Sequence, residues 1–288
     1  MNLYCDFKSQ EEIDKQYDVG AATPGRESFL NHAITESEKT RRNLNCKLDI
    51  RYGPSLDETL DIFPAKQANP PVLVFIHGGY WRDLTSKEFS FIANSFVENG
   101  ITVVVSNYSL CPKVSISEIT RQNRAVIAWL ARHIEEYNGD PDSIYVSGHS
   151  AGGHLTAMIC SSDWQGEYGL DQGIVKGGLA ISGLFDLQPF RYSFLQPTLS
   201  LSHEIIMRES PCFRIPETGP GMILTVGEKE SSEFHRQAQE YHQARLNKGL
   251  KSEYRVEANQ DHFSILFDFI DPGSSLFATT MKMLKSDV

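Results

Sequence analysis

The sequence predicts an α/β fold, built on one mostly parallel sheet of eight strands with helices on both faces. The first observation is alternation, because short β-rich runs and segments of helical spacing follow one another along most of the chain. The second is the near-continuous apolar character of Val72–Ile76 and Thr102–Ser106, which is typical of strands buried on both faces. Helices between such strands supply the crossover connections that parallel pairing needs.

The predicted strands are Lys47–Arg51, Glu58–Phe63, Val72–Ile76, Thr102–Ser106, Ser143–Ser147, Gly177–Ser182, Met222–Val226 and Glu253–Glu257. The first two follow each other without a helix between them, so we expect an antiparallel start to the sheet. The predicted helices are Lys87–Glu98, Ile116–Tyr137, Ala151–Ser161, Glu233–Asn247 and Ser275–Lys285. In the second of these helices, apolar residues form one stripe opposite arginine and glutamate side chains.

A chain of 288 residues is compatible with one domain or two. Two segments fall outside the alternation: residues 1–45 are polar with helical spacing, and residues 186–220 are rich in proline. We expect both segments to cover one end of the sheet as a small helical cap. Residues 1–288 are therefore predicted to form a single domain.

The net charge of −10 argues against nucleic acid or an anionic membrane as a partner, because both require a dense basic surface. No apolar run approaches the roughly 20 residues of a membrane span. The first residues are polar where a secretion signal has an apolar core, and the five cysteines form no CxxC pair. We therefore expect a cytoplasmic protein with reduced thiols and no zinc site.

A five-residue motif, Gly148-His149-Ser150-Ala151-Gly152, lies between a predicted strand and a predicted helix. A serine in such a tight turn has a strained backbone, and the flanking glycines leave space that Cβ atoms would fill. The helix that follows supplies a backbone N–H and a positive dipole end, which favour a developing oxyanion. This pattern is typical of the nucleophile elbow of α/β-hydrolases, so Ser150 is the candidate nucleophile.

A second motif, His77-Gly78-Gly79-Tyr80-Trp81, directly follows the strand Val72–Ile76. Consecutive glycines allow backbone N–H groups to approach a substrate oxygen without interference from side chains. In α/β-hydrolases the loop at this place completes the oxyanion hole.

The remaining triad members should follow in the order serine, acid, histidine. Of the nine histidines, His262 follows the last predicted strand and is the candidate general base. The acid should lie just after the strand Met222–Val226. Glu230 is the preferred residue there, with Glu228 next, and Asp186 after an earlier strand is a further alternative. The chain contains no H-E-x-x-H, P-loop or G-x-G-x-x-G motif, so no metal or cofactor is expected.

Six stretches of the chain carry a resemblance to a known family: GHSAGGHL (148–155), HGGYW (77–81), DIFP (61–64), SGLFDLQP (182–189), SEFHRQ (232–237) and DHF (261–263). Together they resemble the kynurenine formamidases (arylformamidases), which are cofactor-free α/β-hydrolases close to the hormone-sensitive-lipase-like esterases. The resemblance runs from about Tyr52 to Phe267. It implies Ser150 as nucleophile, His262 as base, and Glu230 as acid at a position where the family usually has aspartate. The oxyanion donors that it implies are the backbone N–H groups of Gly78, Gly79 and Ala151.

The resemblance implies hydrolysis of N-formyl-L-kynurenine to formate and kynurenine, a step of tryptophan breakdown. Four aromatic residues are candidates to hold the aryl ring of this small-molecule substrate: Tyr80, Trp81, Phe185 and Phe190. A broad-specificity carboxylesterase or amidase acting on small acyl groups is the alternative, because the same triad serves both. A binding protein that keeps the fold without catalysis is a third hypothesis. The sequence leaves open whether the chain forms a homodimer.

Overall fold

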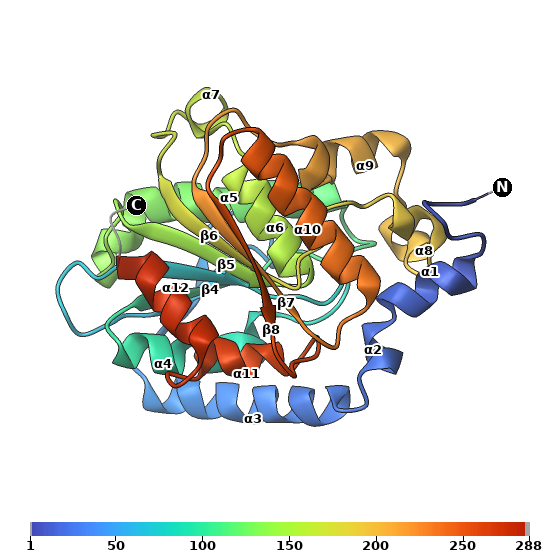
Figure 1. Ribbon diagram of the computed structural model, residues 1–288. Coiled ribbons are helices and arrows are strands. Elements are labelled where there is room, and N and C mark those ends of the chain that lie inside the picture. The colour runs from blue at the N-terminus through green and yellow to red at the C-terminus, as the bar shows by residue number, and fades with distance from the viewer. Residues whose placement is uncertain (1, 286–288) are drawn as a thin grey trace.

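The computed structural model describes residues 2–285 and is centred on an eight-stranded sheet (Figure 1). The strands are β1 Lys47–Arg51, β2 Thr59–Phe63, β3 Val72–Ile76, β4 Thr102–Ser106, β5 Ile144–His149, β6 Val175–Ile181, β7 Gly221–Gly227 and β8 Ser252–Glu257. They lie in the order β1-β2-β4-β3-β5-β6-β7-β8. β2 is antiparallel to both of its neighbours, and all other pairs are parallel. The predicted mostly parallel sheet with an antiparallel start is therefore confirmed.

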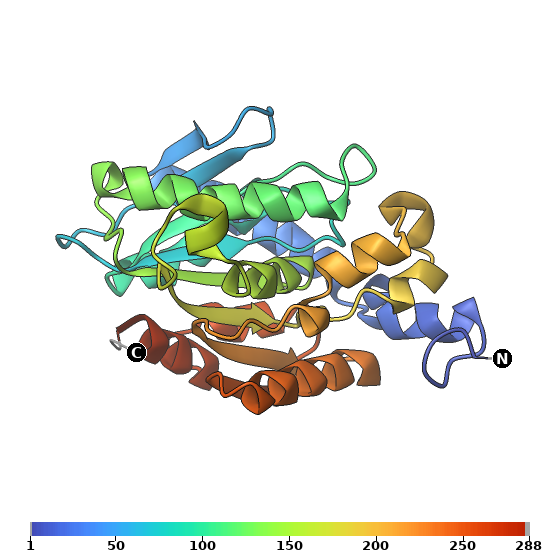
Figure 2. The same ribbon diagram turned by 90° about the horizontal axis from the view of Figure 1, so that it is seen from above.

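Helices cover both faces of this sheet (Figure 2). The α-helices are α1 Gln10–Tyr17, α2 Val19–Ala22, α3 Arg26–Asn43, α4 Ala93–Glu98, α5 Ile116–His133, α6 Ala151–Cys160, α7 Trp164–Tyr168, α8 Gln196–Leu199, α9 His203–Glu209, α10 Ser232–Asn247, α11 Ile265–Ile270 and α12 Ser275–Lys285. The 3₁₀ segments are η1 Ser86–Ile92, η2 Ile134–Tyr137, η3 Pro189–Tyr192 and η4 Pro211–Phe213. One face carries α5, α6 and α10, and the other carries α3, α4, α11 and α12 (Figure 1).

The core forms where apolar strands meet the apolar stripes of these helices. Every residue of β3 and β4 is buried, as the near-continuous apolar runs predict. On α5 the buried stripe includes Ile119, Val126 and Leu130. Full burial of each such side chain stabilises the fold by about 1.5–3 kcal/mol.

Two segments that were predicted as continuous α-helices are partly 3₁₀ helices in the structure. The segment predicted at Lys87–Glu98 begins as the 3₁₀ helix η1, where Thr85 forms a capping box with Glu88. In 3₁₀ winding, residues three apart eclipse each other, which places Phe89 and Ile92 together in the core. The segment predicted at Ile116–Tyr137 changes from α5 to the 3₁₀ turn η2 after His133.

The two segments expected to form a cap occupy different places. α1 packs against η3 and lies beside α8, next to the carboxyl ends of the parallel strands, and α2 leads from α1 toward α3 (Figure 1). α3, by contrast, packs against η1 on one face of the sheet, because its buried residues Phe29 and Ala33 belong to the core on that side. Of residues 1–45, only the part before α3 therefore lies with the helices of 186–220.

A buried polar network fixes the amino-terminal segment in this position. The Tyr17 hydroxyl donates to Glu233 at 2.8 Å, and the Tyr4 hydroxyl donates to Asp186 at 2.7 Å. Arg236 donates to the Tyr4 oxygen at 2.6 Å and to both carboxylate oxygens of Glu233. Charge-assisted hydrogen bonds of this kind are stronger than neutral ones, so they hold α1 against α10.

Candidate active site

Ser150 occupies the sharp turn between β5 and α6. Its backbone has φ 56° and ψ −118°, a strained conformation for a non-glycine residue. The Ser150 N–H donates to the Ile181 carbonyl on the neighbouring strand at 2.8 Å. A Cβ at Gly148 would overlap the Gly152 carbonyl, and a Cβ at Gly152 would overlap the Ile76 carbonyl. The two glycines of the motif are therefore required by close backbone packing around the turn.

Substitution of Gly152 by alanine tests this packing. We expect Gly152→Ala to lower the free energy of unfolding by about 1–3 kcal/mol, because the added methyl forces the backbones of α6 and β3 apart. Gly25→Ala is the matched control, since its Cβ would meet no atom within 4 Å and its φ is −81°. Urea unfolding should leave the control within about 1 kcal/mol of wild type. Equal stability of the two variants would contradict the argument.

His262 lies in the loop between β8 and α11, and its ring is paired with Glu230 in the turn after β7. The Nδ1 of His262 is 2.6 Å from Oε2 of Glu230. The other oxygen, Oε1, accepts from the Ser182 hydroxyl at 2.6 Å and from the Gly227 N–H at 2.7 Å. Because Nδ1 donates to the carboxylate, Nε2 is the ring nitrogen left to accept a proton.

The other two acid candidates do not contact His262. Glu228 is exposed, and its carboxylate accepts from the backbone N–H of Asn259 at 2.8 Å. Asp186 accepts from the Tyr4 hydroxyl and from the backbone N–H of Gln188. Burial raises the pKa of the Asp186 carboxyl.

The loop after β3 runs directly against the elbow. A Cβ at Gly78 would lie 2.9 Å from the His149 carbonyl oxygen, so this backbone approaches the elbow as closely as glycine permits. Gly79 has φ +108°, a conformation that favours glycine. The Ala151 N–H lies at the first residue of α6, where no intrahelical partner exists. The backbone N–H groups of these three positions remain the expected oxyanion donors.

The aromatic residues that follow these glycines fix the loop. The Tyr80 hydroxyl donates to the Tyr17 carbonyl at 2.6 Å, which ties the loop to the amino-terminal segment. The Trp81 indole N–H donates to Nδ1 of His154 at 3.2 Å, and Nε2 of His154 donates to the Glu209 carbonyl. Both aromatic residues have positive φ, so these contacts stabilise a strained stretch of backbone.

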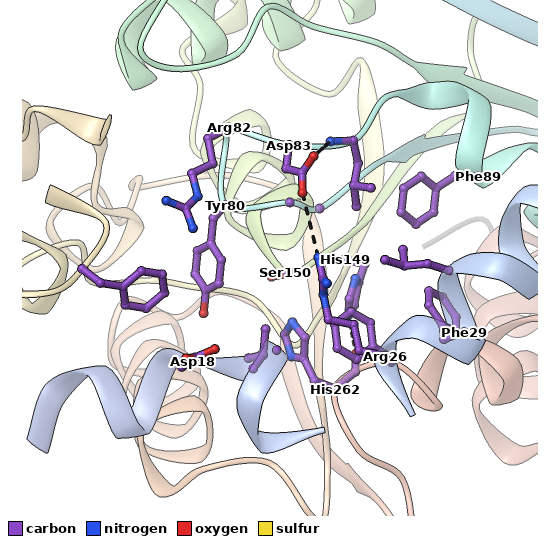
Figure 3. Close-up of a pocket in the computed structure, with 18 residues that line it drawn as sticks. Asp18, Arg26, Phe29, Tyr80, Arg82, Asp83, Phe89, His149, Ser150 and His262 are labelled. Atoms are coloured by element: carbon purple, nitrogen blue, oxygen red, sulfur yellow. Dashed lines mark hydrogen bonds and ion pairs between the residues drawn. The ribbon is translucent and has the colours of Figure 1, made fainter. Parts of the chain in front are cut away.

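A cavity of about 260 Å³ opens at this point, and Ser150 and His262 both line it (Figure 3). Gly78, Gly79 and Tyr80 form part of the same wall. The remaining lining residues are Asp18, Val19, Gly20, Arg26, Phe29, Leu30, Arg82, Asp83, Leu84, Phe89, His149, Phe194 and Phe263. The first six of these come from the amino-terminal segment before and within α3, which carries no motif that would identify them from sequence.

Three of the four aromatic residues predicted to hold a substrate ring do not reach this cavity. Trp81 is fully buried against His154, and Phe185 stacks on Tyr241 with ring centroids 4.6 Å apart. Phe190 is also buried and packs against Tyr80. These three side chains turn into the core, and of the four only Tyr80 lines the cavity.

Three other histidines near the site are buried and neutral. Burial lowers the pKa of His77 to about 4 and that of His154 to about 4, and it lowers the pKa of His149 well below the usual value. Nε2 of His149 donates to the His262 backbone carbonyl at 2.6 Å, which requires an N–H at that position. The His149 ring therefore holds the His262 loop beside the elbow.

Because these histidines are buried and neutral, we expect the stability of the fold to decrease in acid. The unfolded chain takes up protons near pH 6.5, whereas the folded chain does not until about pH 4, so the free energy of unfolding falls as pH drops through this window. We expect a loss of about 1–2 kcal/mol per buried histidine between pH 7 and pH 5, measured by urea unfolding. His77→Phe should flatten this slope, because it removes one of the buried neutral histidines. An unchanged slope in His77→Phe would contradict the prediction.

Within residues 2–285, no group of histidine, cysteine, aspartate or glutamate side chains is arranged to hold a metal ion. None of the helices in that range combines the length and the apolar character needed to cross a membrane.

Comparison with known proteins places this site in context. Residues 60–177 match the BD-FAE family model. The kynurenine formamidase of Danio rerio is 29% identical over 97% of this chain and 98% of its own length. That of Salmo salar is 30% identical over 86% of this chain and 85% of its own length.

Solved structures agree on the architecture. A thioesterase candidate from Silicibacter sp. has a TM-score of 0.84 at 27% identity, covering 93% of this chain and 98% of that chain. An esterase from Pyrobaculum calidifontis has a TM-score of 0.71 at 15% identity, over 96% and 95% of the two chains, which supports the fold alone. The protein is an α/β-hydrolase acting on amide or ester bonds. The chain belongs to the kynurenine formamidase family.

Proposed function

We propose that this protein hydrolyses the formamide of N-formyl-L-kynurenine, or of a closely related aryl formamide, to formate and the free amine. Ser150, His262 and Glu230 form the triad. The observation that carries the proposal is the shared cavity, which Ser150, His262 and the glycines of the β3 loop all line. The chain around this cavity matches kynurenine formamidases over nearly its whole length.

In the first half of the reaction, the Ser150 hydroxyl attacks the formyl carbon while Nε2 of His262 takes its proton. The N–H groups of Gly78, Gly79 and Ala151 hold the oxyanion that forms. His262 then gives the proton to the substrate nitrogen, because an arylamine leaves poorly as an anion. The C–N bond breaks, and a formyl ester remains on Ser150.

In the second half, water attacks this ester and His262 takes a proton from the water. The second tetrahedral intermediate collapses, formate leaves, and the proton returns to the Ser150 oxygen. Throughout, Glu230 keeps Nδ1 protonated and stabilises the imidazolium. The two hydrogen bonds that Oε1 of Glu230 accepts keep its other oxygen directed at the ring.

The cavity wall suits an aromatic substrate. Five aromatic side chains line it: Phe29, Tyr80, Phe89, Phe194 and Phe263. Aromatic rings pair favourably in edge-to-face or offset arrangements, so such a wall offers contacts to an aryl formamide that a short aliphatic ester would not use.

The experiment that tests the proposal follows both products from N-formyl-L-kynurenine. The purified protein should release kynurenine, read by absorbance, and formate, read with a formate dehydrogenase, in equal amounts. A reaction without enzyme corrects for spontaneous hydrolysis. Absence of kynurenine release, in a protein that a serine-directed fluorophosphonate still labels, would rule out the proposed substrate.

A carboxylesterase is the second candidate function, because some relatives are named as esterases or as a probable carboxylic ester hydrolase. The esterase LipQ of Mycobacterium tuberculosis is 28% identical over 63% of this chain, although the match spans only 48% of that protein. The same triad chemistry would cleave an aryl ester, so only relative rates separate the two functions.

A further inference from the structure

The cavity carries charged side chains that the hydrolytic chemistry does not use. Arg26, Arg82, Asp18 and Asp83 all line it (Figure 3). Arg82, Asp18 and Asp83 are exposed and Arg26 is partly exposed, so these charges lie where the cavity opens to solvent. Arg26 and Asp83 are partners, with Nη2 of the arginine 3.9 Å from the carboxylate. Arg82 and Asp18 form no ion pair, either with each other or with any other charged side chain of residues 2–285. One cation and one anion are therefore left without a counter-charge in the same cavity.

An aromatic contact holds the Arg82 side chain in place, and no carboxylate of the described residues neutralises its charge. Its guanidinium carbon lies 5.4 Å from the centroid of the Phe194 ring, and Phe194 also lines the cavity. Its backbone N–H donates to the Gly79 carbonyl, which places it in the same loop as the oxyanion glycines. A guanidinium stacked on a ring keeps its planar edge of N–H donors free, and this edge matches a carboxylate.

Asp18 is held in a similar way. It lies between α1 and α2, where Oδ1 caps α2 by accepting from the Ala21 N–H at 3.0 Å. The second carboxylate oxygen remains available to a ligand cation. Figure 3 shows Asp18 and Arg82 on the same side of the cavity as Tyr80. The unpaired charges thus flank one aromatic wall.

We propose that Arg82 and Asp18 form a subsite for a zwitterionic α-amino acid group, with Arg82 binding the carboxylate and Asp18 the ammonium. Arg82 and Asp18 form no ion pair with each other, so both charges remain available to a ligand. An α-amino acid group carries a carboxylate and an ammonium on one carbon, and its charges are therefore complementary to this pair. This inference rests on the proposed function, since it assigns the amino acid end of N-formyl-L-kynurenine to the mouth while the formyl group lies at Ser150. It adds the residues that select such a substrate over a neutral aryl formamide.

The test compares three formamides that share the aryl ring and the ortho ketone. N-formyl-L-kynurenine carries both charges, N-formylkynurenamine carries only the ammonium, and 2′-formamidoacetophenone carries neither. Arg82→Met should raise KM about 10-fold for the first substrate, with less change in kcat, and leave kcat/KM for the other two within about 2-fold. Asp18→Asn, which retains a good helix cap, should weaken the first two substrates and spare the third.

The neutral formamide reports folding and the integrity of the triad in each variant. Arg132→Met is the matched control, because it removes the same charge from an exposed site in the last turn of α5. Arg82→Lys keeps the charge and should recover part of the loss. The subsite is wrong if Arg82→Met affects all three formamides equally or none of them. If the wild type cleaves none of the formamides but cleaves esters, the proposed function fails before any variant is compared.

Discussion

Replacing Ser150 with alanine should lower kcat for N-formyl-L-kynurenine by on the order of 10⁶-fold, because the nucleophile is lost. The residual rate would come from the oxyanion donors and from substrate binding alone. The assay is kynurenine release at saturating substrate, together with labelling by a fluorophosphonate. Wild type should carry one label, on Ser150, and the variant none.

Ser28→Ala is the matched control, since Ser28 is an exposed serine on α3. It should keep both the activity and the label. Thermal unfolding of Ser150→Ala should resemble that of wild type, because alanine is of similar size and leaves the backbone strain of the turn unchanged. A kcat of Ser150→Ala within about 10-fold of that of wild type would show that Ser150 is not the nucleophile.

Glu230→Gln should reduce kcat by about 10⁴-fold, the loss found when a triad carboxylate becomes an amide. The amide nitrogen cannot accept from Nδ1 of His262, so the ring turns or changes its tautomer and Nε2 no longer accepts the Ser150 proton. Glu230→Asp keeps the charge but is one methylene shorter. The kcat of Glu230→Asp should lie between that of wild type and that of the glutamine variant.

Two further variants serve as controls for this acid. Glu228→Gln changes a neighbouring carboxylate that binds the Asn259 N–H, and Asp186→Asn changes one that binds the Tyr4 hydroxyl. Both variants should retain a kcat within about 10-fold of that of wild type, because neither carboxylate contacts His262. A loss in either of them as large as that of Glu230→Gln would reassign the acid.

The strands of the sheet could be predicted closely, because the pattern that identifies each strand lies within a short run of neighbouring residues. β3 and β4 have the bounds expected from their apolar runs, since parallel strands buried on both faces contain little else. The same reasoning applies to the elbow, where Gly148 and Gly152 are required by contacts within a short stretch and one neighbouring strand. Such features are visible in sequence because few residues satisfy them.

From sequence, Glu230 is the preferred acid, but Glu228 in the same turn and Asp186 after an earlier strand stay open as alternatives. Glu228 and Glu230 are two positions apart, and only their direction in three dimensions separates them. The turn after β7 directs Glu230 toward His262, and the Ser182 hydroxyl from the adjacent strand end holds it there. Where the family usually has aspartate, the longer glutamate side chain reaches the ring at 2.6 Å.

The cavity wall could not be predicted, because it depends on contacts between distant parts of the chain. Tyr80 binds the carbonyl of Tyr17, and Tyr17 binds Glu233, which is 216 residues further along. These contacts bring Asp18 and Arg26 over Ser150 without any local pattern in the sequence. For the same reason, aromatic residues chosen by their proximity to motifs, such as Phe185, proved to be core residues.

The most direct test of the account is the ratio of kcat/KM for N-formyl-L-kynurenine to kcat/KM for phenyl acetate and phenyl butyrate, measured on one preparation. We expect a larger kcat/KM for the formamide, at least about 10⁴ M⁻¹s⁻¹, although amides are intrinsically less reactive than aryl esters. Ester hydrolysis faster by several orders of magnitude, with no turnover of the formamide, would contradict it.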